Sequence, residues 1–218
     1  MKIIPIIISL LLLYIPSKGQ YNPRKYHAFD EVKKLAYNSD FKQNHRIQLT
    51  DTTRKGCAIS EIQDNKLMLL NNCSEAVYTN LDLPVLYDGN FEIVAEVRIY
   101  CGETNDMLRD GFISWAVEGN SYTYNTFAFT SDEFYGFHSR DGKTGRCENK
   151  LYRIRHSYFY DTYARYTLRK YGDKYYFFIN GRLIGTAPYI DTGGTLLELG
   201  AAPKAYTLYK LLAVYYLP

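Results

Sequence analysis

The sequence predicts an all-β fold, and three observations support this prediction. After about residue 45 the chain consists of short apolar or alternating runs separated by turn residues. The run Phe91–Ile99 alternates, so its odd-numbered residues share one face. Tyr, Phe, Val, Ile and Thr dominate the runs, as strands prefer. Many short strands with regular turns and little helix predict one domain, built as an antiparallel two-sheet β-sandwich or a barrel.

Turn signals divide these runs. They are Asp88-Gly89, Asp141-Gly142, Gly172-Asp173 and Asn180-Gly181. Asn-Gly is a strong signal for a two-residue hairpin, because both central positions need a positive φ. We therefore expect Tyr175–Ile179 and Arg182–Gly185 to form a hairpin.

The N-terminus has the features of a secretory signal peptide. Lys2 precedes the apolar run Ile3–Ile15, and small residues follow up to Gly19, where we expect cleavage. The run is shorter than the roughly 20 residues of a membrane-spanning helix, although an uncleaved anchor is the alternative. We expect a signal peptide at 1–19, an N-terminal segment at 20–45 and a β-sandwich domain at 46–218. The mature chain should have no membrane span and should be secreted, periplasmic or on the cell surface.

The N-terminal segment is predicted to be partly helical, over residues 23–37. Asn22 can cap such a helix and Pro23 suits its first position. Phe29, Val32 and Ala36 would then fall near one face. This short helix should pack against the sandwich or lead into it.

Four cysteines in an exported chain favour disulfide bonds. Cys57 and Cys73 lie eight residues either side of Asn65, so a hairpin centred there would place them opposite each other. We therefore predict Cys57–Cys73, which leaves Cys101–Cys147. The spacings contain no C-x2-C pair, which argues against zinc.

Charge argues against a nucleic-acid partner. The chain carries a net charge of only +3, and Lys2 and Lys18 lie in the predicted signal, so the mature chain is closer still to neutral. A nucleic-acid-binding protein needs a clustered positive field.

The run Tyr166–Ile184 resembles the signature hairpin of concanavalin A-like (laminin-G-like) lectin and glucanase jelly rolls, including their strand of the type Y-x-F-x-I-N-G-x-L. Leu197-Glu198-Leu199-Gly200 resembles a later strand, L-x-I-G, and Leu211–Tyr216 their closing strand. At the level of pattern the resemblance covers about residues 55–217. It implies a jelly-roll sandwich, a fold that hosts lectins, glycosidases and adhesion modules.

The chemistry of the glycosidases is not visible in the sequence. Such enzymes on this fold carry E-x-D-x-x-E or E-x-D-x-E on one strand, and no such run occurs here. Glu92 and Glu96 lie on the polar face of an ordinary strand. We therefore expect no catalytic residues and lean against an enzyme. No cofactor is expected, although Glu103, Asp106 and Asp110 crowd one loop that could hold Ca²⁺.

Tyrosine is abundant, with 23 residues against the single Trp115. Most should serve strand packing. Tyr122 and Tyr124 share a face by period two, as do Gly136 and His138, and Trp115 lies in the preceding strand. In the resembled fold these strands form the concave sheet where ligands bind, so Trp115, Tyr122, Tyr124 and His138 are the candidate ligand-binding residues.

The expected function is that of a non-catalytic, lectin-like module that binds a glycan. The alternatives are a protein-interaction or adhesion module of laminin-G type, which would bind a surface protein, and a divergent glycoside hydrolase with carboxylates supplied by different strands.

Overall fold

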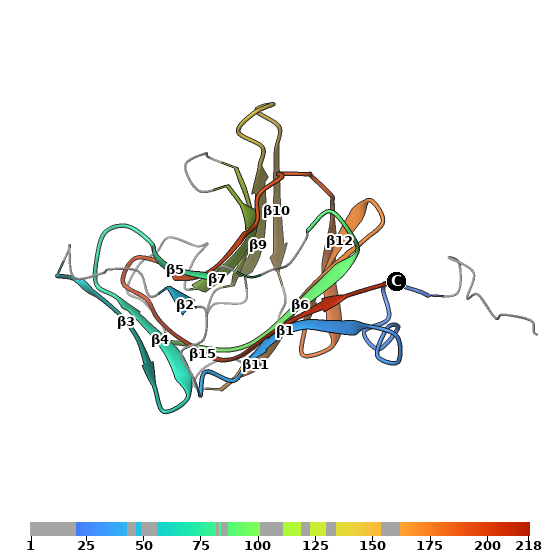
Figure 1. The fold of residues 1–218 in the computed structure, drawn as a ribbon. Coiled ribbons are helices and arrows are strands. Elements are labelled where there is room, and N and C mark those ends of the chain that lie inside the picture. Colours follow the sequence, from blue (N-terminus) through green and yellow to red (C-terminus); the bar gives the residue numbers. More distant parts are fainter. Residues whose placement is uncertain are drawn as a thin grey trace, which may run out of the picture.

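A computed structural model describes residues 21–42, 47–48, 56–81, 83, 87–100, 111–118, 123–129, 134–153 and 162–218. Within these residues the chain forms strands and no helix, arranged as two antiparallel sheets (Figure 1). The predicted all-β sandwich is therefore confirmed. The predicted signal peptide lies outside the described residues, and no described helix is long and apolar enough to cross a membrane.

Sheet A has the strand order β13-β12-β11-β6-β15-β4-β3, and β1 pairs with the part of β15 that extends beyond β4. Its strands are β1 (Lys34–Ser39), β3 (Ala58–Gln63), β4 (Lys66–Asn71), β6 (Phe91–Tyr100), β11 (Ala164–Tyr171), β12 (Lys174–Ile179), β13 (Arg182–Pro188) and β15 (Tyr206–Tyr216).

Sheet B has the order β10-β9-β8-β7-β14-β5-β2. Its strands are β2 (Ile47–Gln48), β5 (Val77–Leu81), β7 (Gly111–Val117), β8 (Tyr124–Phe129), β9 (Phe134–Arg140), β10 (Cys147–Arg153) and β14 (Leu196–Ala201).

The core between the sheets is rich in aromatic side chains. Phe127 and Phe137 of sheet B pack on Phe177 of sheet A, with ring centroids 4.9 and 5.2 Å apart. Trp115 meets Tyr175 edge to face at 5.3 Å. All five rings are buried between the sheets. Because side chains alternate along a strand, the residues next to them in each strand point outward.

Two predicted hairpins are present. β12 and β13 are joined at Asn180 and Gly181, whose φ angles of 47° and 79° are the positive values that this turn requires. β3 and β4 turn at Asp64 and Asn65, which also have positive φ.

The β3–β4 hairpin carries the first predicted disulfide. Cys57 and Cys73 are bonded, with their Cα atoms 5.2 Å apart. This pairing follows from the register that the turn at Asn65 sets, so the prediction is confirmed.

The predicted Cys101–Cys147 bond is not formed, because Cys147 has a free thiol, while Cys101 lies outside the described residues. Ile99, near the end of β6, pairs with Thr207, and Thr207 lies against Gly111 at the start of β7. Cys147 begins β10 near the other end of sheet B, level with Ala116 close to the end of β7. A seven-residue strand spans roughly 20 Å, so the end of β6 is too far from Cys147 for a bond.

The predicted helix over 23–37 is wrong. Residues 23–32 form successive turns, with backbone bonds such as Lys25 N to Asn22 O at 3.0 Å and Lys33 N to Phe29 O at 2.9 Å. Residues 34–39 are strand β1. The cause is a tertiary contact. β15 extends beyond β4 and so has a free edge, and residues 34–39 form backbone hydrogen bonds with that edge as a strand.

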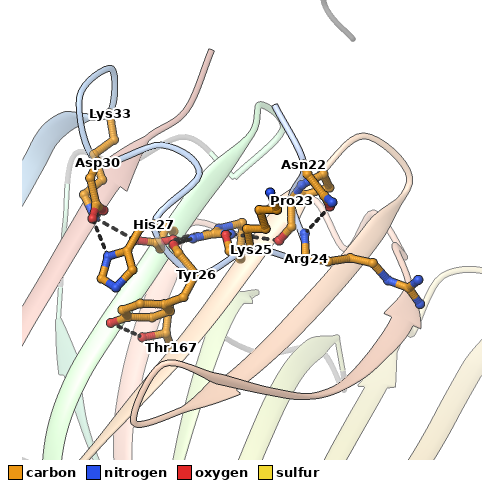
Figure 2. A network of polar contacts seen from close by, with 11 residues as sticks. Asn22, Pro23, Arg24, Lys25, Tyr26, His27, Asp30, Lys33 and Thr167 are labelled. Carbon is orange, nitrogen blue, oxygen red and sulfur yellow. Dashed lines mark hydrogen bonds and ion pairs between the residues drawn. The ribbon is translucent and has the colours of Figure 1, made fainter. Parts of the chain in front are cut away.

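The turns over residues 22–33 lie on the outer face of sheet A (Figure 2). Figure 2 shows Tyr26 pointing toward Thr167 of β11, and their hydroxyls lie 3.4 Å apart. Phe29 is fully buried there and packs on Tyr171. These turns therefore cover part of the outer face of sheet A.

Candidate functional site

A groove of about 780 Å³ lies on the outer face of sheet B. Side chains from β5, β7, β8, β9, β10 and β14 line it. Because the strands alternate, most of these residues point away from the aromatic core; Phe137, which belongs to the core, is an exception. The groove is therefore built on regular strands and crosses most of the sheet.

One row of residues across this face is entirely polar. Successive ladder partners on neighbouring strands are Asn80, Glu198, Ser114, Thr126, His138 and Asn149. We call these six residues the polar row. With strands about 4.8 Å apart, five intervals span roughly 24 Å. The polar row therefore runs perpendicular to the strands for most of the width of the sheet.

The next row along the strands is apolar or small. It contains Tyr78, Gly200, Phe112, Ala128, Gly136 and Leu151, which we call the apolar row. Gly200, Ala128 and Gly136 have little or no side chain, and so they leave space above the sheet. Tyr78 and Leu151, at the two ends of this row, are 41% and 56% exposed.

Phe112 occupies the space above Gly200. A Cβ atom placed on Gly200 would lie only 1.9 Å from Phe112 Cζ, so the ring lies directly on the glycine. Phe112 is 8% exposed although it faces outward. This contact places an apolar ring in the floor of the groove, and the position of the ring depends on glycine at position 200.

An aromatic pair stands at the other side of the groove. Tyr124 and His138 stack with ring centroids 5.3 Å apart and an interplanar angle of 28°. His138 Nδ1 is hydrogen-bonded to Asn149 Oδ1, which holds the imidazole in place. The phenol and the imidazole together offer a ring surface with polar atoms beside it.

Some side chains of the polar row form hydrogen bonds with one another. The hydroxyls of Ser114 and Thr126 are hydrogen-bonded at 2.8 Å, and His138 is bonded to Asn149. Glu198 differs, because no described residue forms an ion pair or hydrogen bond with its carboxylate. Burial raises the pKa of the Glu198 carboxyl to about 7. Oδ1 of Asn80 is buried and has no hydrogen-bond partner among the described residues.

The predicted site residues are not all in the groove. Tyr124 and His138 line it. Trp115 is fully buried on the other face of β7, where it stacks on Phe137, so it cannot contact a ligand. Tyr122 lies outside the described residues.

The candidate calcium ligands Glu103, Asp106 and Asp110 also lie outside the described residues. Within the described part, no three His, Cys, Asp or Glu side chains are grouped so as to hold a metal ion.

Sequence reasoning missed the acceptors at the β5 end of the row. Glu198 lies between two leucines that face the core, a pattern that marks it as an outward residue on a strand. Its position opposite Asn80 and Ser114 depends on the pairing of strands far apart in the chain, which local patterns do not reveal.

A second carboxylate lies at the rim of the groove. Glu118 follows the end of β7 and forms an ion pair with Lys143 at 3.3 Å. The outward residues of β8 are Tyr124, Thr126 and Ala128, so that strand presents no acid to the groove.

Comparison with known proteins gives matches of fold only. No protein-family model matches the sequence, and no curated protein matches it. Among solved structures, the carbohydrate-binding module CBM66 from Bacillus subtilis is similar, with 9% identity and a TM-score of 0.54 over 72% of this chain and 89% of that chain.

An endo-beta-1,3-glucanase from Pyrococcus furiosus is also similar, with 10% identity and a TM-score of 0.58 over 85% of this chain and 95% of that chain. A Bacillus subtilis protein of unknown function with a galectin-like fold gives 11% identity and a TM-score of 0.55, covering 85% and 100% of the two chains. Together with the two antiparallel sheets, these matches show that the chain has the concanavalin A-like jelly-roll fold.

Proposed function

We propose that this protein is a secreted, non-catalytic carbohydrate-binding module, and that its groove on sheet B holds a glycan chain lying across the strands. The observation that carries the proposal is the polar row running beside the apolar row over six strands. A glycan chain has the same division, since each sugar has hydroxyl groups at its edges and apolar C–H faces. The fold similarity to a carbohydrate-binding module and to glucanases supports the same class of ligand.

The ring surfaces of the groove suit sugars. Tyr124 and His138 present a stacked pair, and the Phe112 ring lies against Gly200. Apolar sugar faces pack on such rings while neighbouring polar groups fix the orientation. The groove is built on strands rather than loops, so it is preorganised and little conformational entropy is lost on binding.

The distribution of carboxylates favours binding over hydrolysis. Glycosidases need two carboxyl groups about 5 to 9.5 Å apart across the scissile bond. Among the described residues, the carboxylates that line the groove are Glu198 and Glu118. Glu198 is opposite Ser114, whereas Glu118 follows the end of β7, beyond the positive-φ residue Ala116, and its carboxylate is already paired with Lys143.

Export agrees with the chemistry of the chain. The Cys57–Cys73 disulfide suits an oxidising compartment, and the predicted signal peptide would deliver the protein there. We therefore place the protein in the periplasm, at the cell surface or outside the cell, where a glycan-binding module meets its ligand.

A glycan array, followed by affinity electrophoresis on the polysaccharides it identifies, tests this proposal. We expect wild-type protein to bind and Tyr124→Ala to weaken binding about tenfold or more, because a stacking ring is lost. The matched control is Tyr206→Ala, which removes an aromatic side chain from the outer face of sheet A and should leave the affinity unchanged.

Two results would contradict the proposal. The absence of binding to any glycan, with and without Ca²⁺, would remove the ligand class. Release of reducing sugar from a bound polysaccharide, abolished by Glu198→Gln, would instead assign a hydrolase.

A further inference from the structure

Glu198 is a hydrogen-bond acceptor in the groove without a donor. It lines the groove, and no described residue forms a hydrogen bond or ion pair with its carboxylate. Its ladder partner Asn80 has its Cβ about 5 Å away on the same face, but Asn80 does not line the groove and its Oδ1 is buried, so a ligand reaches Glu198 alone.

The other members of the polar row that line the groove do not share this property. Ser114 bonds Thr126, and His138 bonds Asn149, so each of these pairs combines a donor with an acceptor. A buried acceptor without a partner costs about 1 to 3 kcal/mol, and more for a charged group. Glu198 is therefore the member of the polar row that gains most from a donor brought by the ligand.

The surroundings of Glu198 supply no positive charge. The described residues that face it from β5 are Asn80 and Tyr78, and those from β7 are Ser114 and Phe112. None of the four is cationic. The other charged or titratable side chains that line the groove in the described part of the chain are Glu118, Tyr124, His138 and Lys150. His138 is two strands beyond Ser114, and Lys150 is on β10, one strand further. An ionised Glu198 thus lacks a counter-ion in the described protein.

We propose that Glu198 forms a subsite for an amino group, and that the glycan this groove prefers carries free amines on its sugars. This inference rests on the proposed function, since it names the class of glycan that the groove takes. An ammonium group provides several N–H donors and a positive charge, so it can bond the Glu198 carboxylate and neutralise it. A hydroxyl group has one donor and no charge.

The direction of the Glu198 titration agrees with this assignment. Burial without a counter-ion disfavours the ionised carboxyl and raises its pKa to about 7. A bound ammonium would restore the ionised form, so we expect the complex to contain an ion pair that free protein lacks.

Three oligosaccharides of equal length test the inference by titration calorimetry at neutral pH. Those derived from cellulose, chitin and chitosan share one backbone and differ at C2, which carries a hydroxyl, an acetamido group or a free amine. We expect the amine-bearing oligosaccharide to bind roughly 10- to 100-fold more tightly than the other two, which is the value of a charge-assisted hydrogen bond. Glu198→Gln should abolish this preference and change the affinity for the neutral oligosaccharides only slightly.

The control variant is Glu118→Gln. It makes the same change of charge at the rim of the same groove, where Glu118 is already paired with Lys143. If the preference reflects Glu198, this variant keeps it. If the preference is a general attraction of a cationic chain to the protein, both variants reduce it equally, and the inference is overturned.

The remaining outcomes are also decisive. Equal binding of all three oligosaccharides, or binding of none of them while the array finds another glycan that needs Tyr124, overturns the amine subsite and leaves the proposed function standing. A blank array overturns both.

Discussion

Arg169 and Glu92 form an ion pair that solvent does not reach. The Arg169 Nη2 atom lies 2.6 Å from Glu92 Oε2, and the two side chains are 0% and 2% exposed. The same guanidinium donates hydrogen bonds to the carbonyl oxygens of Pro23, Lys25 and Tyr26. One side chain of β11 thus attaches the N-terminal turns of Figure 2 to sheet A.

Replacing Arg169 with leucine should therefore be strongly destabilising. The change removes one of the two cations that pair with the buried Glu92 carboxylate, Lys33 being the other, and it leaves the turn carbonyls without this donor. We expect a loss of about 3 kcal/mol in the free energy of unfolding. Arg165→Leu is the control on the same strand. Arg165 pairs with Glu96 but is about half exposed, so its loss should cost under about 1 kcal/mol. Equal losses in urea titrations of the two variants would contradict the role assigned to Arg169.

The cysteines should contribute unequally. Replacing both Cys57 and Cys73 with serine opens a loop of about 15 residues and should cost roughly 3 kcal/mol of stability. Cys147→Ser should be neutral, because that thiol is free and exposed. Non-reducing peptide mapping checks the pairing, and a peptide joined through Cys147 would contradict this assignment.

The sequence predicted local structure better than it predicted pairing between distant segments. The turns at Asn180-Gly181 and at Asn65 could be predicted because Asn and Gly tolerate the positive φ that such turns require. The Cys57–Cys73 bond then followed from the second turn. The prediction of an N-terminal helix was wrong because the conformation of Lys34–Ser39 depends on pairing with the free edge of β15, nearly 180 residues away in the chain.

The same distinction applies to the site. Tyr124 and His138, which line the groove, were selected in the sequence through period-two alternation. Trp115 was misassigned, because alternation says that two faces exist without saying which one is covered by the second sheet. The polar row was not found, since its six members come from six strands and only the ladder register aligns them.

Gly200→Ala should alter the floor of the groove. The new Cβ would overlap Phe112, so the ring must move off the sheet and into the groove, at a cost of about 1 to 3 kcal/mol in stability. Glycan affinity should fall as well. Gly89→Ala is the control, because nothing lies within 4 Å of its added Cβ. A Gly200→Ala variant with wild-type stability and affinity would contradict the contact.

Stability should depend on pH through Glu198. Burial raises the pKa of its carboxyl from 4.5 to about 7, so between these values the native state binds more protons than the unfolded state. The free energy of unfolding should therefore fall as the pH rises through this window. Glu198→Gln removes this titration, so the variant should exceed wild type by about 2 kcal/mol above the window and approach it at the acidic end. Parallel stability curves for the two proteins would contradict the burial of this carboxyl.

The central claim is that the outer face of sheet B holds the glycan. Amide chemical-shift mapping by NMR during titration with a glycan identified on the array tests it most directly. We expect the perturbed residues to follow the polar and apolar rows across β5, β14, β7, β8, β9 and β10, with sheet A unchanged. Perturbations concentrated on the outer face of sheet A, with none along Glu198, Ser114 and Thr126, would contradict it.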